Sequence, residues 1–152
     1  MFARLFPLVA DNRYSGRRLG LWLFGLMPVK VLMGLNVIVN TSKVAESADG
    51  VPVGSFDPAG ARAFLFMFAA WGLCQVILGL AALVVLVRYR SLVPLAFLAL
   101  LLEQTGRMLL RQAWPIERVG TPAGFYINAA LLGIIVIGLA SSLWRARPVG
   151  GA

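Results

Sequence analysis

Three charged residues lie inside apolar stretches of this chain, where a charge needs either a partner or a task. Glu103 and Arg107 stand four residues apart in "LLLEQTGRMLLR", and Lys30 follows "GLMPV". A carboxylate and cations of this kind pair with one another, exchange protons or bind a polar ligand. At the middle of a membrane-spanning helix each charge costs about 2.5 to 3.5 kcal/mol on insertion scales. All three residues are therefore candidates for a buried polar site.

The elements that must position these residues are membrane-spanning helices. The chain has 152 residues, of which 60% are hydrophobic and 13% charged, and its mean hydropathy is +0.85. Soluble domains carry roughly a quarter charged residues. Four stretches have the length of about 20 apolar residues that crosses a bilayer, namely Leu19–Val39, Phe64–Val87, Leu92–Leu110 and Gly124–Trp144. The sequence predicts an all-α, four-span transmembrane helical bundle over residues 19–144.

The segments outside the spans also carry structural signals. Residues 1–18 are expected to be a cytoplasmic N-terminal segment, whose first nine residues either lie in the membrane interface or form a disordered tail. Residues 145–152 are expected to be a cytoplasmic tail. Asp57 before Pro58 is typical of a helix start, and Ser91 is expected to cap the third span. The long connection, residues 40–63, is rich in turn residues, and we expect it to tolerate insertion near Asp49–Gly50.

The distribution of basic residues predicts the orientation of the bundle. Eight of them share one side with both termini: Arg4, Arg13, Arg17, Arg18, Arg88, Arg90, Arg145 and Arg147. The other side has four: Lys43, Arg62, Arg111 and Arg118. The positive-inside rule therefore predicts an N-in, C-in multi-pass protein of the cell membrane, and we expect a bacterial inner membrane. Membrane topology and anionic lipid headgroups explain the net charge of +8. The expected partners are therefore the lipid bilayer and either a membrane protein complex or further copies of this chain. No nucleic-acid partner is expected.

Helical depth predicts which polar residues meet. Lys30 and Glu103 each lie about eleven residues, or about 16 Å, from the inner end of their spans, and Gln75 lies at a similar level. The expected intramembrane polar cluster is Lys30, Gln75, Glu103 and Arg107, with a candidate second layer of Asn36, Gln104 and Asn128. Arg107, Asn128 and Asn36 are expected to share a level one turn further out. Three interpretations of the cluster are open. It is a functional site, or it is a structural network that fixes helix pairing. In the third, Arg107 and Arg111 extend their side chains to the outer interface and no buried cluster forms.

Several chemistries are excluded by composition. The chain has no histidine, so histidine-ligated haem or zinc and a Ser-His-Asp triad are excluded. Its single cysteine, Cys74, cannot form a dithiol pair within one chain. We predict no catalytic residue and no metal ligand, and the prediction leans against an enzyme.

The stretch "FMFAAWGLCQVILGLAALVVLVRYRS" followed by "LLLEQTGRMLL" resembles the middle helical hairpin of DoxX-like small bacterial four-helix membrane proteins. The shared features are a glycine-bearing helix, a short arginine turn and a helix that closes with Gly106-Arg107, over residues 61–111. Some members of that group are linked to quinone-connected redox complexes. The resemblance thus implies a quinone as the one cofactor to consider, and no other is predicted.

Two classes of function fit these observations. The first is a non-catalytic accessory or lipid/quinone-like ligand-binding bundle that holds its ligand at the Lys-Glu-Arg cluster. The alternative is a small proton-coupled transporter in which the intramembrane Glu103 exchanges a proton against substrate. An enzyme ranks third, because no nucleophile or metal set accompanies Glu103 and Lys30.

The orientation is testable with reporter fusions. A reporter after Ala152 should give a cytoplasmic signal and one within residues 40–63 an extracytoplasmic signal, because the basic flanks stay on the inner side. An extracytoplasmic signal from the C-terminal fusion contradicts this topology.

Overall fold

The computed structural model describes residues 2–120 and 122–144, so the predicted tail 145–152 and Thr121 lie outside the described residues. Every regular element in the described part of the chain is a helix. The elements are α1 (Phe2–Leu5), α2 (Arg18–Phe24), α3 (Val29–Val39), α4 (Thr41–Ser47), η1 (Val53–Ser55), α5 (Pro58–Arg88), η2 (Arg90–Leu92), α6 (Val93–Ala113) and α7 (Ala123–Leu143). The predicted all-α class is confirmed.

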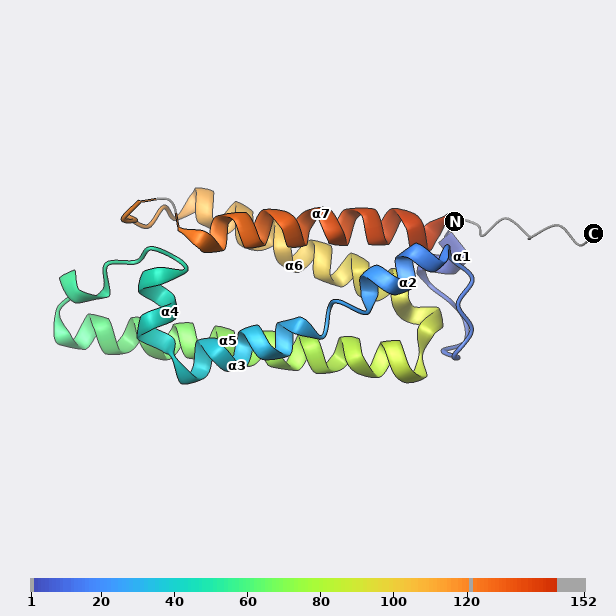
Figure 1. Ribbon diagram of the computed structural model, residues 1–152, viewed down its shortest axis with the longest axis horizontal. Coiled ribbons are helices and arrows are strands. Elements are labelled where there is room, and N and C mark those ends of the chain that lie inside the picture. Colours follow the sequence, from blue (N-terminus) through green and yellow to red (C-terminus); the bar gives the residue numbers. More distant parts are fainter. Residues whose placement is uncertain (1, 121, 145–152) are drawn as a thin grey trace, which may run out of the picture.

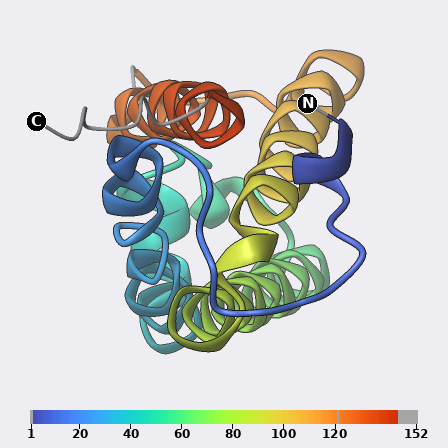
Figure 2. The same cartoon turned by 90° about the vertical axis from the view of Figure 1, so that its right-hand side faces the viewer.

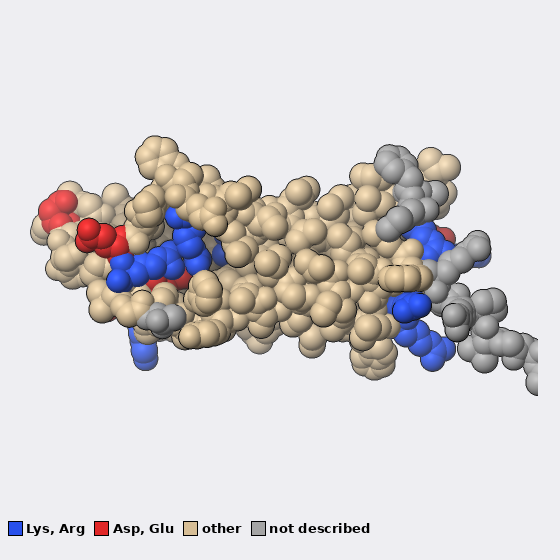
Figure 3. Space-filling model, turned by 90° about the horizontal axis from the view of Figure 1, so that it is seen from above, with Lys and Arg blue, Asp and Glu red and all other residues tan. Residues whose placement is uncertain are grey.

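Four helical stretches are long and apolar enough to cross a membrane: Arg18–Val39, Pro58–Arg88, Arg90–Ala113 and Ala123–Leu143. In Figure 3 a broad band of uncharged side chains separates the charged side chains at the two ends of the molecule. The second span begins at Pro58, before the predicted Phe64, because the Asp57 carboxylate caps it by accepting hydrogen bonds from the backbone N–H groups of Ala59 and Gly60, both 3.0 Å long. The bundle is that of an integral membrane protein.

The first span is two helices with a break between them, whereas the sequence suggests one. From Leu26 to Val31 the backbone N–H groups donate in an i→i−3 pattern, as in Met27 N to Phe24 O at 2.9 Å. Pro28 has no N–H to donate, which favours such a break. Phe24 and Met27 are both 0% exposed, and the Phe24 ring meets the Phe97 ring edge-on at 5.1 Å. The break is therefore held in the largest apolar core of the bundle.

The break lets the first span change partners along its length. Figure 1 shows α3 lying beside α5 in one layer and α6 beside α7 in the other, with α2 crossing to α7; Figure 2 shows the same arrangement from one end. The α2–α7 contact is so close that the backbone N–H of Arg17 donates to Ser141 O at 3.1 Å. At the opposite end, α3 and α7 belong to different layers.

Glycines allow the close approach of α3 and α5. A methyl group added at Gly34 would lie 2.5 Å from the carbonyl oxygen of Gly72, and one at Gly79 would lie 2.7 Å from the backbone nitrogen of Val31. Small residues at such positions let two membrane helices bring their backbones together. This interface brings the face of Lys30 against the face of Gln75.

The connection over residues 40–63 packs against the bundle, which corrects the expectation of a free turn segment. It forms α4 and η1, and Ala45, Val51 and Val53 form a small buried core with aromatic residues of α5. Its backbone accepts hydrogen bonds from Gly124 N to Ala48 O at 2.8 Å and from Val119 N to Gly50 O at 2.9 Å. Since Gly50 is buried with φ of +69°, an insertion beside it should disturb the fold.

The cap predicted at Ser91 is wrong. The third span begins without a side-chain cap, and the Ser91 hydroxyl instead donates to Asp11 O and accepts from Asp11 N, both at 2.9 Å. These bonds tie the N-terminal segment to the α5–α6 turn. At the same end, an Arg4 guanidinium nitrogen donates to Leu143 O at 3.2 Å.

The glycine interface generates a stability prediction. Gly34→Ala should destabilise the protein by about 1–3 kcal/mol, because the added methyl group meets backbone atoms of α5. The matched control is Gly133→Ala on α7, where nothing lies within 4 Å of the added methyl group; it should be neutral or stabilising by up to about 1 kcal/mol. Thermal unfolding in detergent measures both, and equal effects would show that α3 and α5 do not approach as described.

Candidate functional site

The carboxylate of Glu103 is the centre of the predicted cluster. The Lys30 ammonium group donates to Oε2 at 3.2 Å, and the Gln75 side-chain amide donates to Oε1 at 3.0 Å. The Arg107 Nε atom lies 2.6 Å from Oε1 as an ion pair, although its N–H is not directed at the oxygen as in a hydrogen bond. The structure thus brings together all four residues of the cluster, from α3, α5 and α6.

Local structure explains why these side chains face inward. Lys30 follows the Pro28 break and is 3% exposed, so its charge is removed from lipid. Gln75 is 5% exposed and lies between Gly72 and Gly79 on the face of α5 that meets α3. Glu103 and Arg107 are four residues apart on α6, so they share one face.

The candidate second layer forms only in part. Gln104, 1% exposed, donates through Nε2 to the Asn128 backbone and side-chain oxygens at 3.1 Å, and Asn128 donates to Gly124 O at 2.7 Å. Arg107 donates to Gln104 Oε1 and, at 3.3 Å, to Asn128 Oδ1. Asn36 does not join this network, because its exposed side chain accepts from Asn40 Nδ2 at 2.8 Å. Gln104 and Asn128 link α6 to α7 at the level of Arg107.

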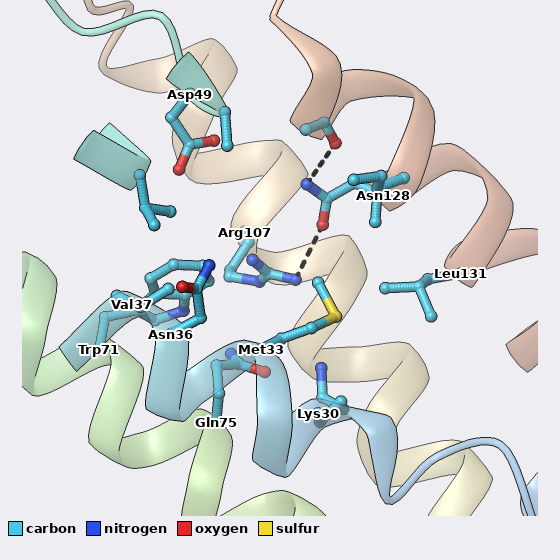
Figure 4. A pocket seen from close by; sticks show the side chains of 14 residues that line it. Lys30, Met33, Asn36, Val37, Asp49, Trp71, Gln75, Arg107, Asn128 and Leu131 are labelled. Atoms are coloured by element: carbon cyan, nitrogen blue, oxygen red, sulfur yellow. Dashed lines mark hydrogen bonds between the residues drawn. The ribbon is translucent and has the colours of Figure 1, made fainter. Parts of the chain in front are cut away.

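A cavity of about 200 Å³ lies next to the cluster, on the side that faces α4. Figure 4 shows Lys30, Gln75 and Arg107 facing it from three helices, with Asn128 on the fourth side. Val44, Ala48 and Asp49 of the 40–63 connection line its other end, and its remaining wall is mainly apolar. Glu103 does not line the cavity: it lies behind the cations, while Lys30 and Gln75 form the polar floor.

The polar floor retains unused hydrogen-bonding capacity. An ammonium group has three N–H donors, and Lys30 spends one of them on the described residues, at Glu103. The Gln75 carbonyl oxygen accepts no hydrogen bond from any residue in the described part of the chain. Trp71 Nε1 is likewise buried without an acceptor there. A ligand that accepts from Lys30 or donates to Gln75 would form hydrogen bonds that the described residues leave unmade.

Sequence reasoning missed two residues of this site. Trp71 precedes Gln75 by one helical turn and lines the cavity, with the Arg107 guanidinium 5.2 Å from its ring centroid. Its spacing of four residues from Gln75 was a usable signal. Asp49 lies in the connection, where no periodicity applies, and only tertiary packing brings it to the cavity.

Asp49 is half-buried and lies outside the spanning helices. Burial raises the pKa of its carboxyl group, while the positive charges of Arg118, Arg111 and Arg107 act in the opposite direction. Because the pKa is raised overall, the nearby positive charges do not fully offset the cost of burying the ionised Asp49 carboxylate.

The described residues contain no group of three His, Cys, Asp or Glu side chains able to hold a metal ion. Comparisons with protein-family models, with curated proteins and with solved structures find no match for this chain. The resemblance to DoxX-like proteins therefore stays a prediction.

A double-mutant cycle tests which cation is the principal partner of Glu103. We expect Lys30→Met or Glu103→Gln alone to destabilise by about 3–5 kcal/mol, because each leaves an uncompensated buried charge. The double variant should lose less than the sum. Lys30 has no other hydrogen bond to a described residue, whereas Arg107 also contacts Gln104 and Asn128. The Lys30–Glu103 coupling should therefore exceed the Arg107–Glu103 coupling, measured with Arg107→Met by thermal unfolding. The reverse order would make Arg107 the principal partner.

Proposed function

We propose that this protein is a non-catalytic, ligand-binding bundle of a bacterial inner membrane. It holds a quinone-like or lipid-like molecule by its acceptor oxygens in the cavity above the charge cluster. In this proposal it acts as an accessory subunit of a membrane protein complex, which the resemblance to DoxX-like proteins favours, or as a homo-oligomer.

The observation that carries the proposal is the unused hydrogen-bonding capacity of Lys30 and Gln75, which faces an otherwise largely apolar cavity. A polar network that only fixes helix pairing stabilises the fold most when every donor and acceptor is paired within the protein. Here the polar floor and apolar wall together have the character of a ligand pocket.

The charges of the site favour acceptor oxygens in the ligand. Lys30 and Arg107 line the cavity, and the Glu103 carboxylate that balances them lies behind. A carbonyl or other electron-rich oxygen would accept the remaining N–H groups of Lys30. The cavity of about 200 Å³ is smaller than the roughly 300 Å³ or more of drug-sized pockets, so it fits a ring or headgroup and not a long tail.

The alternative, a proton-coupled transporter, receives less support. A substrate in the cavity would touch Lys30, Gln75 and Arg107, but Glu103 is not among the lining residues. Coupling through Glu103 would first require the ion pairs that cover it to open.

Thermal unfolding with a short-tailed benzoquinone and with a single-chain lipid tests the proposal. At a concentration of 100 times Kd, a bound probe should stabilise the protein by about 2.7 kcal/mol. Leu131→Phe fills the cavity and should weaken binding at least tenfold. Gln75→Leu should weaken binding by removing part of the polar floor.

The matched control is Leu109→Phe, which adds the same volume on α6 at a side chain that is 65% exposed, and it should bind normally. An alkylbenzene of equal tail length that lacks acceptor oxygens should not stabilise the protein. If neither oxygen-bearing probe stabilises the wild type, or if Leu131→Phe binds as tightly as Leu109→Phe, the cavity is not the ligand site.

A further inference from the structure

A second hollow, of about 430 Å³, lies at the α4 end of the molecule between α5 and the end of α6. Asp49, Trp71 and Arg107 line both hollows, and Trp71 and Arg107 are the part of the wall between groove and cavity that lies on the spanning helices. The groove also contains Arg111 and Arg118, and Figure 3 shows basic and acidic side chains gathered at this end of the molecule.

The charges of the groove are unbalanced. Arg107, Arg111 and Arg118 line it together with a single acidic residue, Asp49. Arg107 is already paired with Glu103, but Arg111 and Arg118 make no hydrogen bond or ion pair with any described residue, although both are half-buried. Asp49 acts on them only as a nearby charge, and its own pKa is raised by burial. Two partly desolvated guanidinium groups therefore remain available to an anion.

The positive-inside rule does not explain these arginines. In the expected orientation they lie on the outer side, which carries four basic residues against eight on the inner side. Two of those four converge on one groove. The convergence of these arginines therefore indicates that the groove itself has a function.

The rest of the groove is aromatic and apolar. Phe64 and Phe68 lie along α5, with their rings stacked at 5.7 Å, and Leu110 lies on α6. Trp114, directly after the end of α6, is 77% exposed, and tryptophan is enriched where the bilayer meets water. The groove thus has cations at the level of lipid headgroups and an apolar strip that continues along a spanning helix.

We propose that this groove binds an anionic phospholipid from the leaflet at the α4 end. Arg111 and Arg118 hold its phosphate in bidentate hydrogen bonds, and its acyl chain lies against Phe64 and Phe68. This site is separate from the ligand cavity and does not depend on what the cavity binds. A bound lipid would cover the outer side of the wall formed by Trp71 and Arg107.

Titration of purified protein in neutral detergent with dioctanoyl phosphatidylglycerol tests this site, with thermal unfolding as the readout. The lipid should stabilise the wild type saturably, and raising the salt from 0.1 to 0.5 M should weaken its binding, because the contacts are electrostatic and partly exposed. Dioctanoyl phosphatidylcholine, whose headgroup has no net charge, should bind at least tenfold more weakly. Arg111→Gln with Arg118→Gln should weaken phosphatidylglycerol binding at least tenfold.

The matched control is Arg62→Gln, an exposed arginine on α5 at the same end of the molecule that does not line the groove. It should leave the affinity unchanged, as should Gln75→Leu, so that a failure of this site is distinguishable from a failure of the cavity. Should the double variant not fold, Arg118→Gln alone, in the α6–α7 connection, should still lower the affinity several-fold. Equal binding of the two lipids, equal stabilisation by inorganic phosphate alone, or an equal loss in Arg62→Gln would each overturn the proposal.

Discussion

A carboxylate buried among membrane-spanning helices must be compensated, and the rest of this structure depends on how Glu103 meets that requirement. Its two oxygens take Lys30 from α3, Gln75 from α5 and Arg107 from α6. On α6, Gln104 directly after Glu103 and Arg107 one turn further along both donate to Asn128 on α7. All four spans are thereby linked within about one helical turn of each other. Elsewhere α3 packs mainly against α5, and α7 packs against both α2 and α6, so the polar level adds a second link between the two layers to the one that the first span provides.

The break at Gly25–Pro28 makes room for a cavity beside the polar cluster. Because the first span leaves α7 and continues along α5, α3 does not lie beside α7 at the α4 end, and a cavity lies there between α3, α5, α6 and α7. Lys30 follows the break closely and lies at the floor of this cavity. The 40–63 connection then closes the far end through backbone hydrogen bonds at Ala48 and Gly50. One face of the break is buried in protein, as the exposure of 0% at Phe24 and Met27 shows, whereas Leu26 on its other face is 51% exposed.

The four residues of the cluster have different roles. Glu103 is the counter-ion that allows two cations to remain in the bundle, and it does not face the cavity. Lys30 and Gln75 face the cavity with hydrogen-bonding capacity to spare, whereas Arg107 forms part of the wall between cavity and groove. Because Lys30, Gln75 and Arg107 each contribute to helix packing and also line a hollow, stability and binding must be measured separately in every variant of these residues.

The sequence by itself determined the all-α class, the four apolar stretches and the polar cluster, because hydrocarbon thickness sets helix length and a rise of about 1.5 Å per residue converts position into depth. Depth alone placed Lys30, Gln75 and Glu103 at one level, and the structure joins them. Only the tertiary structure decided that the first span breaks, that Asn36 bonds to Asn40 instead of the cluster, and that Ser91 holds Asp11 instead of capping a helix. The sequence likewise did not determine that the cluster faces a cavity, that Asp49 lines this cavity from a connection, or that Arg118 lines the neighbouring groove. The break and the Asn36–Asn40 bond are local, but the positions of Ser91, Asp49 and Arg118 depend on contacts between segments far apart in the chain, about which periodicity within one helix carries no information.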